Sequence, residues 1–297
     1  MIWVSWRQHR SEAIACLGLL CALAVYAAVL GLSMRSSFGQ NDLAACLARS
    51  QGTGCPNGVY LFMNSFGSLV NVGFWAVLLL LPGLIGVVVG APLLGRELEM
   101  GTWRLAWSQT VPRTRWLAVK LAVVAGGLIV LGAAMTLVIT WYRTPMDRLI
   151  GHFLHNAYDY EGFVLTAYIL FAFGLAVLAG QLLRRSIPAM IAAIVPWLAV
   201  RIVVEFALRP NFMAPLTFTQ NCSKGCGGAT GNFSVPSATG HIGDLVVGYG
   251  GTGNTQLSFY QPASRFWEFQ SIEAGIFVAL TLAALGTAVW LLHRRAA

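Results

Sequence analysis

LVNVGFWAVLLLLPGLIGVVVGAPLL, residues 69–94, is a run of 26 residues without one charged side chain. About 20 such residues form a helix that crosses the hydrocarbon core of a bilayer. Apolar runs of this kind lie at residues 13–32, 69–94, 121–142, 163–183, 187–208 and 272–292. Backbone groups in hydrocarbon must be satisfied within their own segment, so continuous apolar runs indicate helices and not the alternating strands of a barrel. The sequence therefore predicts an all-α membrane protein with six transmembrane helices, folded as one domain over residues 1–297.

The composition supports this fold class. Of the 297 residues, 57% are hydrophobic and 10% are charged, whereas a soluble domain is about 25% charged. Residues 1–12, MIWVSWRQHRSE, carry two Arg and lead into the first apolar run, which is too long for the core of a signal peptide. We expect residues 1–12 to form a cytoplasmic interfacial helix and the first span to be retained.

The basic residues predict the orientation. With six spans, the two termini and the connections after spans 2 and 4 share one side of the membrane. These short segments carry 11 of the 19 Lys and Arg: Arg7, Arg10, Arg96, Arg104, Arg113, Arg115, Lys120, Arg184, Arg185, Arg294 and Arg295. Because basic connections stay in the cytoplasm, we predict a multi-pass plasma-membrane protein with both termini inside. The net charge of +8 then indicates topology and contact with anionic lipids, and no nucleic-acid partner is expected.

Two long segments, residues 33–68 and 209–271, are predicted to lie outside. They contain four of the six cysteines, which are disulfide candidates in an oxidising compartment: Cys46, Cys55, Cys222 and Cys226. Four cysteines allow three connectivities, of which the two local pairs are the simplest, and a metal site is the alternative. In the second segment, DLVVGYG (244–250) and TQLSFYQ (255–261) are typical of two strands of a hairpin across GTGN.

GRELEMGTWRLAWSQTVPRTRW, residues 95–116, concentrates four Arg and two Glu between spans 2 and 3. On a helix, Trp103 and Trp107 lie one turn apart on an apolar face and Arg104 lies on another, which is typical of a helix in the membrane interface. One interpretation is therefore a turn that Arg and Trp hold against anionic lipid.

The same segment resembles part of the permease subunit of type-2 ATP-binding-cassette (ABC) exporters, in particular actinobacterial ones. The resemblance rests on the pattern E-x-E-x-G-T at residues 97–102 with P-R at 112–113, on the six spans, and on YQPASRFWEFQ (260–270) before the last span. It implies that residues 95–116 are a cytoplasmic coupling segment that docks on a separate nucleotide-binding subunit, and that two permease copies pair. The implied interface residues are Arg96, Glu97, Glu99, Gly101, Thr102, Trp103, Arg104 and Trp107.

The chain lacks an ATP site of its own. A phosphate-binding loop requires G-x-x-x-x-G-K-[ST], and neither of the two lysines, Lys120 and Lys224, completes one. We expect no cofactor in this chain, with ATP and Mg bound by the partner subunit. The spans show no nucleophile–base pair, so a transporter subunit is predicted and not an enzyme. Their apolar character favours a hydrophobic or amphiphilic substrate.

Polar and helix-breaking residues within the spans carry further predictions. Pro82-Gly83 in span 2 predicts a kink, either static or used as a hinge, while Gly86 and Gly90 permit close approach of another helix. Arg201 and Glu205 lie one turn apart in span 5 and are expected to pair, because an unpaired charge is costly in the membrane. The pair either stabilises the fold or lines an exit path.

Two other functions fit parts of the sequence. His152, His155 and Asp159 would share one face of a helix, so a membrane metal-dependent enzyme is one alternative, and an ordinary interfacial helix is the simpler interpretation. A non-transporting sensor or immunity component with the same fold is the other alternative. ATP-dependent efflux would distinguish an exporter from both.

Overall fold

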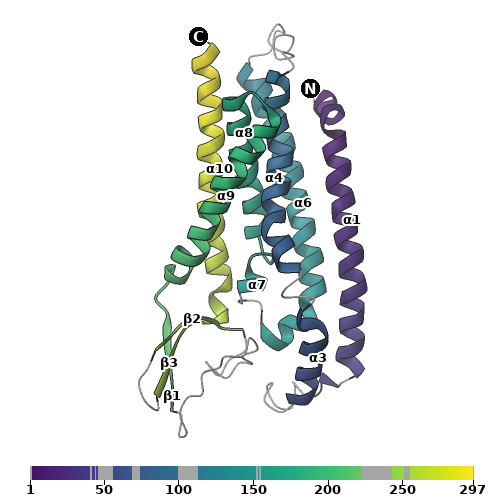
Figure 1. Cartoon of the computed structure of the whole chain (residues 1–297), viewed down its shortest axis with the longest axis vertical. Coiled ribbons are helices and arrows are strands. Elements are labelled where there is room, and N and C mark those ends of the chain that lie inside the picture. The colour runs from purple at the N-terminus through teal and green to yellow at the C-terminus, as the bar shows by residue number, and fades with distance from the viewer. Residues whose placement is uncertain are drawn as a thin grey trace.

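Six helices in the described part of the chain are long and apolar enough to cross a membrane, which confirms the predicted fold class. The computed structural model describes residues 2–40, 42–43, 45, 56–68, 74–99, 113–151, 153, 155–221, 243–250 and 255–296. The six spans, numbered in chain order, are Ile14–Gln40, Leu79–Arg96, Arg115–Ile150, Val164–Leu183, Ser186–Asn211 and Ala263–Leu292. Both chain termini lie at one end of the bundle, here called the terminal end, and the strands lie at the opposite, sheet end (Figure 1).

The elements follow one another as long helices with a small sheet inserted before the last. In chain order they are α1 (Ile2–Gln40), α3 (Pro56–Ser68), α4 (Phe74–Glu99), α6 (Arg113–Ile150), α7 (His155–Tyr158), α8 (Val164–Leu183), α9 (Ser186–Val203), the π-helical turn η2 (Val204–Leu208), the 3-10 turn η3 (Arg209–Asn211), β1 (Leu216–Asn221), β2 (Leu245–Gly250), β3 (Thr255–Gln261), the 3-10 turn η4 (Ala263–Arg265) and α10 (Phe266–Ala296).

Several helices extend beyond the predicted apolar runs. Helix α1 is continuous from Ile2 to Gln40, so residues 2–12 extend the helix of the first span, and their position at the membrane interface stays a prediction. Residues 33–68 and 209–271 are not loops throughout, since the first contains the end of α1 and all of α3, and the second contains the end of span 5 and the start of α10. Helical hydrogen bonding continues into polar residues at the interface, so the length of an apolar run underestimates the length of its helix.

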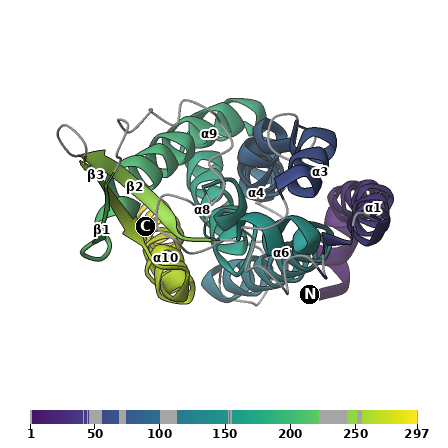
Figure 2. The same ribbon diagram turned by 90° about the horizontal axis from the view of Figure 1, so that it is seen from below.

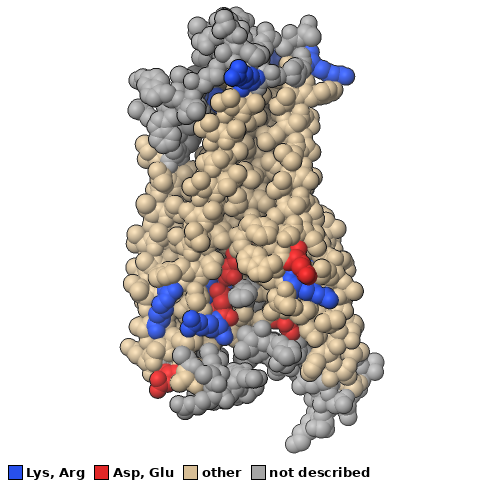
Figure 3. Space-filling model, turned by 180° about the vertical axis from the view of Figure 1, so that it is seen from behind, with Lys and Arg blue, Asp and Glu red and all other residues tan. Residues whose placement is uncertain are grey.

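α8 forms the centre of the bundle. Its span is the most buried of the six: 78% of its most apolar 18-residue stretch is buried, whereas 11% is buried in the corresponding stretch of α1. Seen along the bundle, α4, α6, α9 and α10 surround α8, and α1 lies outermost beside α6 (Figure 2). The space-filling view shows a broad band without charged side chains over the middle of the helices, with charges toward the two ends (Figure 3). This distribution is the one expected of a protein whose solvent is a bilayer.

Glycine residues let α4 and α8 approach each other closely. A Cβ atom on Gly86 would lie 2.4 Å from the carbonyl oxygen of Ile169, and one on Gly90 would lie 2.7 Å from that of Phe173. No side chain fits at these distances, so the close approach predicted for these two glycines is confirmed.

The neighbouring Gly83 meets a different helix. A Cβ atom there would lie 2.6 Å from the indole ring of Trp197 on α9. The helix α4 continues through Pro82 to Glu99. The kink expected at Pro82-Gly83 therefore stays a prediction.

Three antiparallel strands form a sheet in the order β1-β3-β2 at the sheet end. The predicted pairing of β2 with β3 is confirmed, with Tyr249 opposite Ser258. β1 was not predicted, because its partner β3 is distant in sequence and no local turn indicates the pairing. Before the sheet, the backbone of Gly243 packs against Gly151 at the end of α6, where a Cβ on Gly151 would lie 2.1 Å from the Cα of Gly243. Both glycines have positive φ, +79° for Gly151 and +90° for Gly243.

Candidate functional site

Part of the predicted coupling segment is described by the structure. Arg96 and Glu99 are exposed on the last turn of α4. The side chain of Glu97 and five further residues of the segment lie outside the described residues: Gly101, Thr102, Trp103, Arg104 and Trp107. Their contact with an ATPase therefore stays a prediction.

Glu99 joins the end of α4 to the start of α9. One of its carboxylate oxygens accepts hydrogen bonds from the backbone N–H (3.4 Å) and the hydroxyl (3.5 Å) of Ser186, the first residue of α9. The first N–H groups of a helix have no partner within it, and a negative charge is favourable there. Gly95 permits the approach, since a Cβ at this position would lie 3.3 Å from the Cα of Ser186. Lys120 holds the same part of α4 to α6 through the carbonyl oxygen of Leu93 (3.1 Å).

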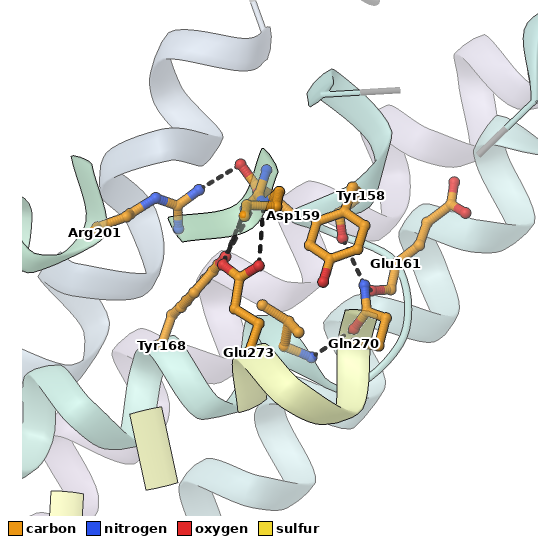
Figure 4. Close-up of polar contacts among 9 residues, drawn as sticks. Tyr158, Asp159, Glu161, Tyr168, Arg201, Gln270 and Glu273 are labelled. Carbon is orange, nitrogen blue, oxygen red and sulfur yellow. Dashed lines mark hydrogen bonds and ion pairs between the residues drawn. The ribbon is translucent and has the colours of Figure 1, made fainter. Parts of the chain in front are cut away.

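A second candidate site is a buried group of charged side chains at the sheet end, here called the ionic cluster: Asp159, Arg201, Glu205, Arg209 and Glu273. Asp159 lies in the turn between α7 and α8, and its two oxygens accept from Nη2 of Arg201 (2.7 Å) and Nη2 of Arg209 (2.5 Å). Arg209 also donates through Nε and Nη2 to Glu273 on α10, at 2.9 and 3.0 Å. The cluster therefore connects the turn, span 5 and α10 (Figure 4).

Aromatic side chains surround the two guanidinium groups. The hydroxyl of Tyr168 on α8 lies 2.5 Å from Glu273 and 3.2 Å from Asp159. The Arg201 guanidinium lies over the Tyr168 ring at 4.1 Å from its centroid, and that of Arg209 lies over Tyr158 at 4.3 Å. Such contacts stabilise a desolvated cation by about 2 kcal/mol.

A change of helix type directs both arginines to Asp159. In a continuous α-helix, Arg201 and Arg209 would differ by about 80° around the axis. Span 5 instead adopts π geometry over Val204–Leu208 before the 3-10 turn at Arg209. A π-helix takes more residues per turn, so it rotates Arg209 back toward the side of Arg201.

The structure corrects the pair predicted within span 5. Arg201 pairs with Asp159 and not with Glu205, because the turn before α8 places a fully buried carboxylate directly at its guanidinium group. Burial alone would raise the pKa of Asp159, but Arg209 and Arg201 outweigh it and hold that pKa below its ordinary value. Asp159 is therefore a charged partner of two arginines.

This result also bears on the metal hypothesis. His152 and the side chain of His155 lie outside the described residues, and Asp159 is engaged by two cations. Over the residues that the structure describes, no group of three or more His, Cys, Asp or Glu side chains is arranged to hold a metal ion. The four disulfide candidates, Cys46, Cys55, Cys222 and Cys226, fall outside the described part of the chain.

A smaller charged group adjoins the ionic cluster. Arg143 on α6 donates to Glu161 (3.3 Å) and to Asp147 (3.3 Å), and all three side chains are buried. Burial, followed by the charge of Asp147, raises the pKa of Glu161 to about 8, although Arg143 opposes the shift. A carboxyl group at the sheet end thus changes charge near neutral pH.

Gln270 on α10 fixes the turn that carries Asp159 and Glu161. Its Nε2 donates to the carbonyl oxygens of Tyr158 (2.9 Å) and Glu161 (3.0 Å), and its Oε1 accepts from the N–H of Val164 (3.1 Å). Gly162, with φ of +70°, lies so close that a Cβ would be 2.7 Å from Oε1 of Gln270. These contacts hold the Asp159 carboxylate in place (Figure 4).

Sequence reasoning missed Asp159 as the partner of Arg201, and also Arg209 and Glu273. A signal was present for Glu273, since it lies within the predicted span 6, where a charged side chain requires a partner. Arg209 lies directly beyond the predicted end of span 5, so it resembled an ordinary interfacial residue.

The fold and these charged groups define a multi-pass helical membrane protein that keeps its charges at the two ends of the bundle. A family model described as ABC-2 membrane transporter related matches residues 17–209, more than half of the chain. The chain therefore belongs to the ABC-2 membrane transporter-related family, which suggests a transmembrane component of an ABC transporter. No curated protein and no solved structure matches the chain. The family match includes residues 95–116 and ends before the sheet and span 6.

Proposed function

We propose that this chain is the permease subunit of an ATP-driven exporter in the plasma membrane. It works as a pair of permease copies with a separate nucleotide-binding subunit that binds ATP and Mg. The observation that carries the proposal is the family match over residues 17–209. In this proposal the terminal end faces the cytoplasm, and the substrate is hydrophobic or amphiphilic because the spans are apolar.

The contacts at the end of α4 support residues 95–116 as the docking segment. Glu99 connects α4 to the start of α9, and Lys120 connects α4 to α6. A subunit that docks on this segment would therefore act on spans 2, 3 and 5 together. A flexible turn against lipid would not require such connections.

The test is copurification of the chain with the P-loop ATPase encoded nearby, followed by ATPase assays in lipid nanodiscs. Charge reversal by Glu97→Lys, or the bulky Gly101→Trp, is expected to abolish ATPase stimulation while membrane insertion stays normal. Glu268→Lys is the matched control, because this exposed acidic residue lies at the sheet end. Parent-like stimulation by both variants, or a parent that binds no ATPase, would refute the docking segment.

Efflux separates the exporter from a sensor or immunity component of the same fold. Inverted vesicles with the parent complex are expected to accumulate a fluorescent amphiphile only when ATP is present. The control is an ATPase variant that cannot hydrolyse ATP. ATP binding and hydrolysis without transport of any amphiphile tested would favour the non-transporting alternative.

A further inference from the structure

The ionic cluster contains one acidic side chain more than it has basic ones. Its members are all buried: Asp159, Glu205 and Glu273 against Arg201 and Arg209. If all five were charged, three negative charges would face two positive ones. An uncompensated buried charge is strongly unfavourable, so the cluster is expected to hold one additional positive charge.

The contacts identify the carboxyl group in excess. Asp159 pairs with both arginines, and Glu273 pairs with Arg209 and accepts from the hydroxyl of Tyr168. Glu205 forms no ion pair or hydrogen bond with the residues that the structure describes, although only 4% of its surface is exposed. Glu205 is therefore the acidic side chain in excess.

The arginines offer donors that Glu205 does not use. Three buried nitrogen atoms of these arginines have no hydrogen-bond partner within the described part of the chain: Nε and Nη1 of Arg201 and Nη1 of Arg209. Glu205 is four residues from Arg201, the spacing at which opposite charges pair on an α-helix, and it lies in the same π turn that precedes Arg209. A charged carboxylate would be attracted to these donors. The carboxyl group of Glu205 forms no hydrogen bond with these donors, which is the arrangement expected when the group is neutral.

We propose that Glu205 is a proton-binding site and that its carboxyl group holds the proton in the state described. When the proton passes to water at the sheet end, the carboxylate accepts hydrogen bonds from the unused donors of Arg201 and Arg209. The Glu205 carboxylate then competes with Asp159 and Glu273 for the two guanidinium groups. The ion pairs that connect span 5 to the turn and to α10 therefore weaken. The charged and titratable groups that act on Glu205 are Arg201 and Arg209 on its own span, Asp159 and Tyr160 on the turn and Glu273 on α10. Tyr168 on α8 contacts two of them, Asp159 and Glu273.

Infrared spectroscopy of the purified chain in nanodiscs tests the protonation directly, without the ATPase or a substrate. At neutral pH, Glu205→Gln is expected to remove one protonated-carboxyl C=O band, which shifts on transfer to D2O. Glu273→Gln is the matched control and is expected to remove a carboxylate band instead. Loss of a carboxylate band in Glu205→Gln, with all protonated-carboxyl bands retained, would overturn the proposal.

A second experiment tests whether loss of the Glu205 proton weakens the contacts of span 5 with α10. Spin labels on cysteines at the exposed positions Phe206 on span 5 and Trp267 on α10 report, by pulsed electron paramagnetic resonance, the distance between these two elements at the sheet end. In the labelled parent, the distance distribution is expected to shift between neutral and alkaline pH, and Glu205→Gln or Glu205→Leu is expected to abolish that shift. The same pH dependence in both neutral variants would assign it to another group and overturn the coupling.

Discussion

Replacement of Asp159 by Asn is expected to destabilise the protein more than any other single charge neutralisation in the ionic cluster. Asp159 is fully buried and accepts from Arg201 at 2.7 Å and from Arg209 at 2.5 Å. Arg209 would keep Glu273 as a partner, but Arg201 has no other ion pair among the described residues and two of its nitrogen atoms already lack acceptors. The variant would therefore leave one buried guanidinium group uncompensated.

Loss of one partner of a buried ion pair costs about 3–5 kcal/mol. This corresponds to a change of roughly 100-fold to several thousandfold in the unfolding equilibrium constant. The assay is reversible unfolding in bicelles, with the free energy of unfolding measured for the parent and each variant. Glu205→Gln is the matched control and is expected to differ from the parent by about 1 kcal/mol or less, because Glu205 pairs with neither arginine.

A double variant shows whether the lost stability comes from the uncompensated charge or from poorer packing. Arg201→Met in the Asp159→Asn background removes the uncompensated guanidinium group, so it is expected to restore part of the lost stability. An Asp159→Asn protein within about 1 kcal/mol of the parent, or a double variant less stable than Asp159→Asn, would refute the assignment of Asp159 as the main partner of Arg201.

Three further predictions concern other parts of the chain. Folding raises the pKa of Glu161 from 4.5 to about 8. The stabilisation that comes from its proton is therefore complete below pH 4.5 and is lost as pH rises through 8. Glu161→Gln should flatten this part of the curve of unfolding free energy against pH, and Glu268→Gln, at an exposed position, should not. Gly86→Ala is expected to destabilise by about 1–3 kcal/mol, measured by the same unfolding assay, whereas Gly127→Ala should be neutral or stabilising because open space surrounds Gly127. Cys46, Cys55, Cys222 and Cys226 are expected to resist thiol labelling after denaturation without reductant. Free labelling of all four would contradict the disulfides and remove one independent support of the orientation.

The predictions that succeeded depend on local properties of the sequence. Each span is encoded by its own apolar run, so the six spans and the fold class follow from hydropathy. The strands β2 and β3 are separated by only four residues in the sequence, and Gly86 and Gly90 present one surface of one helix. In each case a single stretch of sequence contains the whole signal.

The predictions that failed required contacts between distant residues. Arg201 and Asp159 are 42 positions apart, and the local spacing of Arg201 and Glu205 suggested a simpler pair. The sequence does show that charged residues in spans 5 and 6 need partners, but it does not show which ones. The turn before α8 provides the partner of Arg201, and the π turn at Val204–Leu208 brings Arg209 to the same carboxylate. No periodicity of the apolar residues indicates the position of the π turn.

Span 5 is the element that connects the two candidate sites. It begins at Ser186, which donates to Glu99 at the edge of the proposed docking segment, and its other end carries Arg201 and Arg209 in the ionic cluster. An α-helix transmits displacement along its axis because each turn is hydrogen-bonded to the next, whereas a π turn is a common site of local rearrangement. A displacement of the end of α4 would therefore pass along α9 toward Val204–Leu208, although Pro196 removes one hydrogen bond within α9. That turn sets the direction of Arg209, so we expect the two ends of the bundle to be coupled through the pairing of this arginine with Asp159 and Glu273.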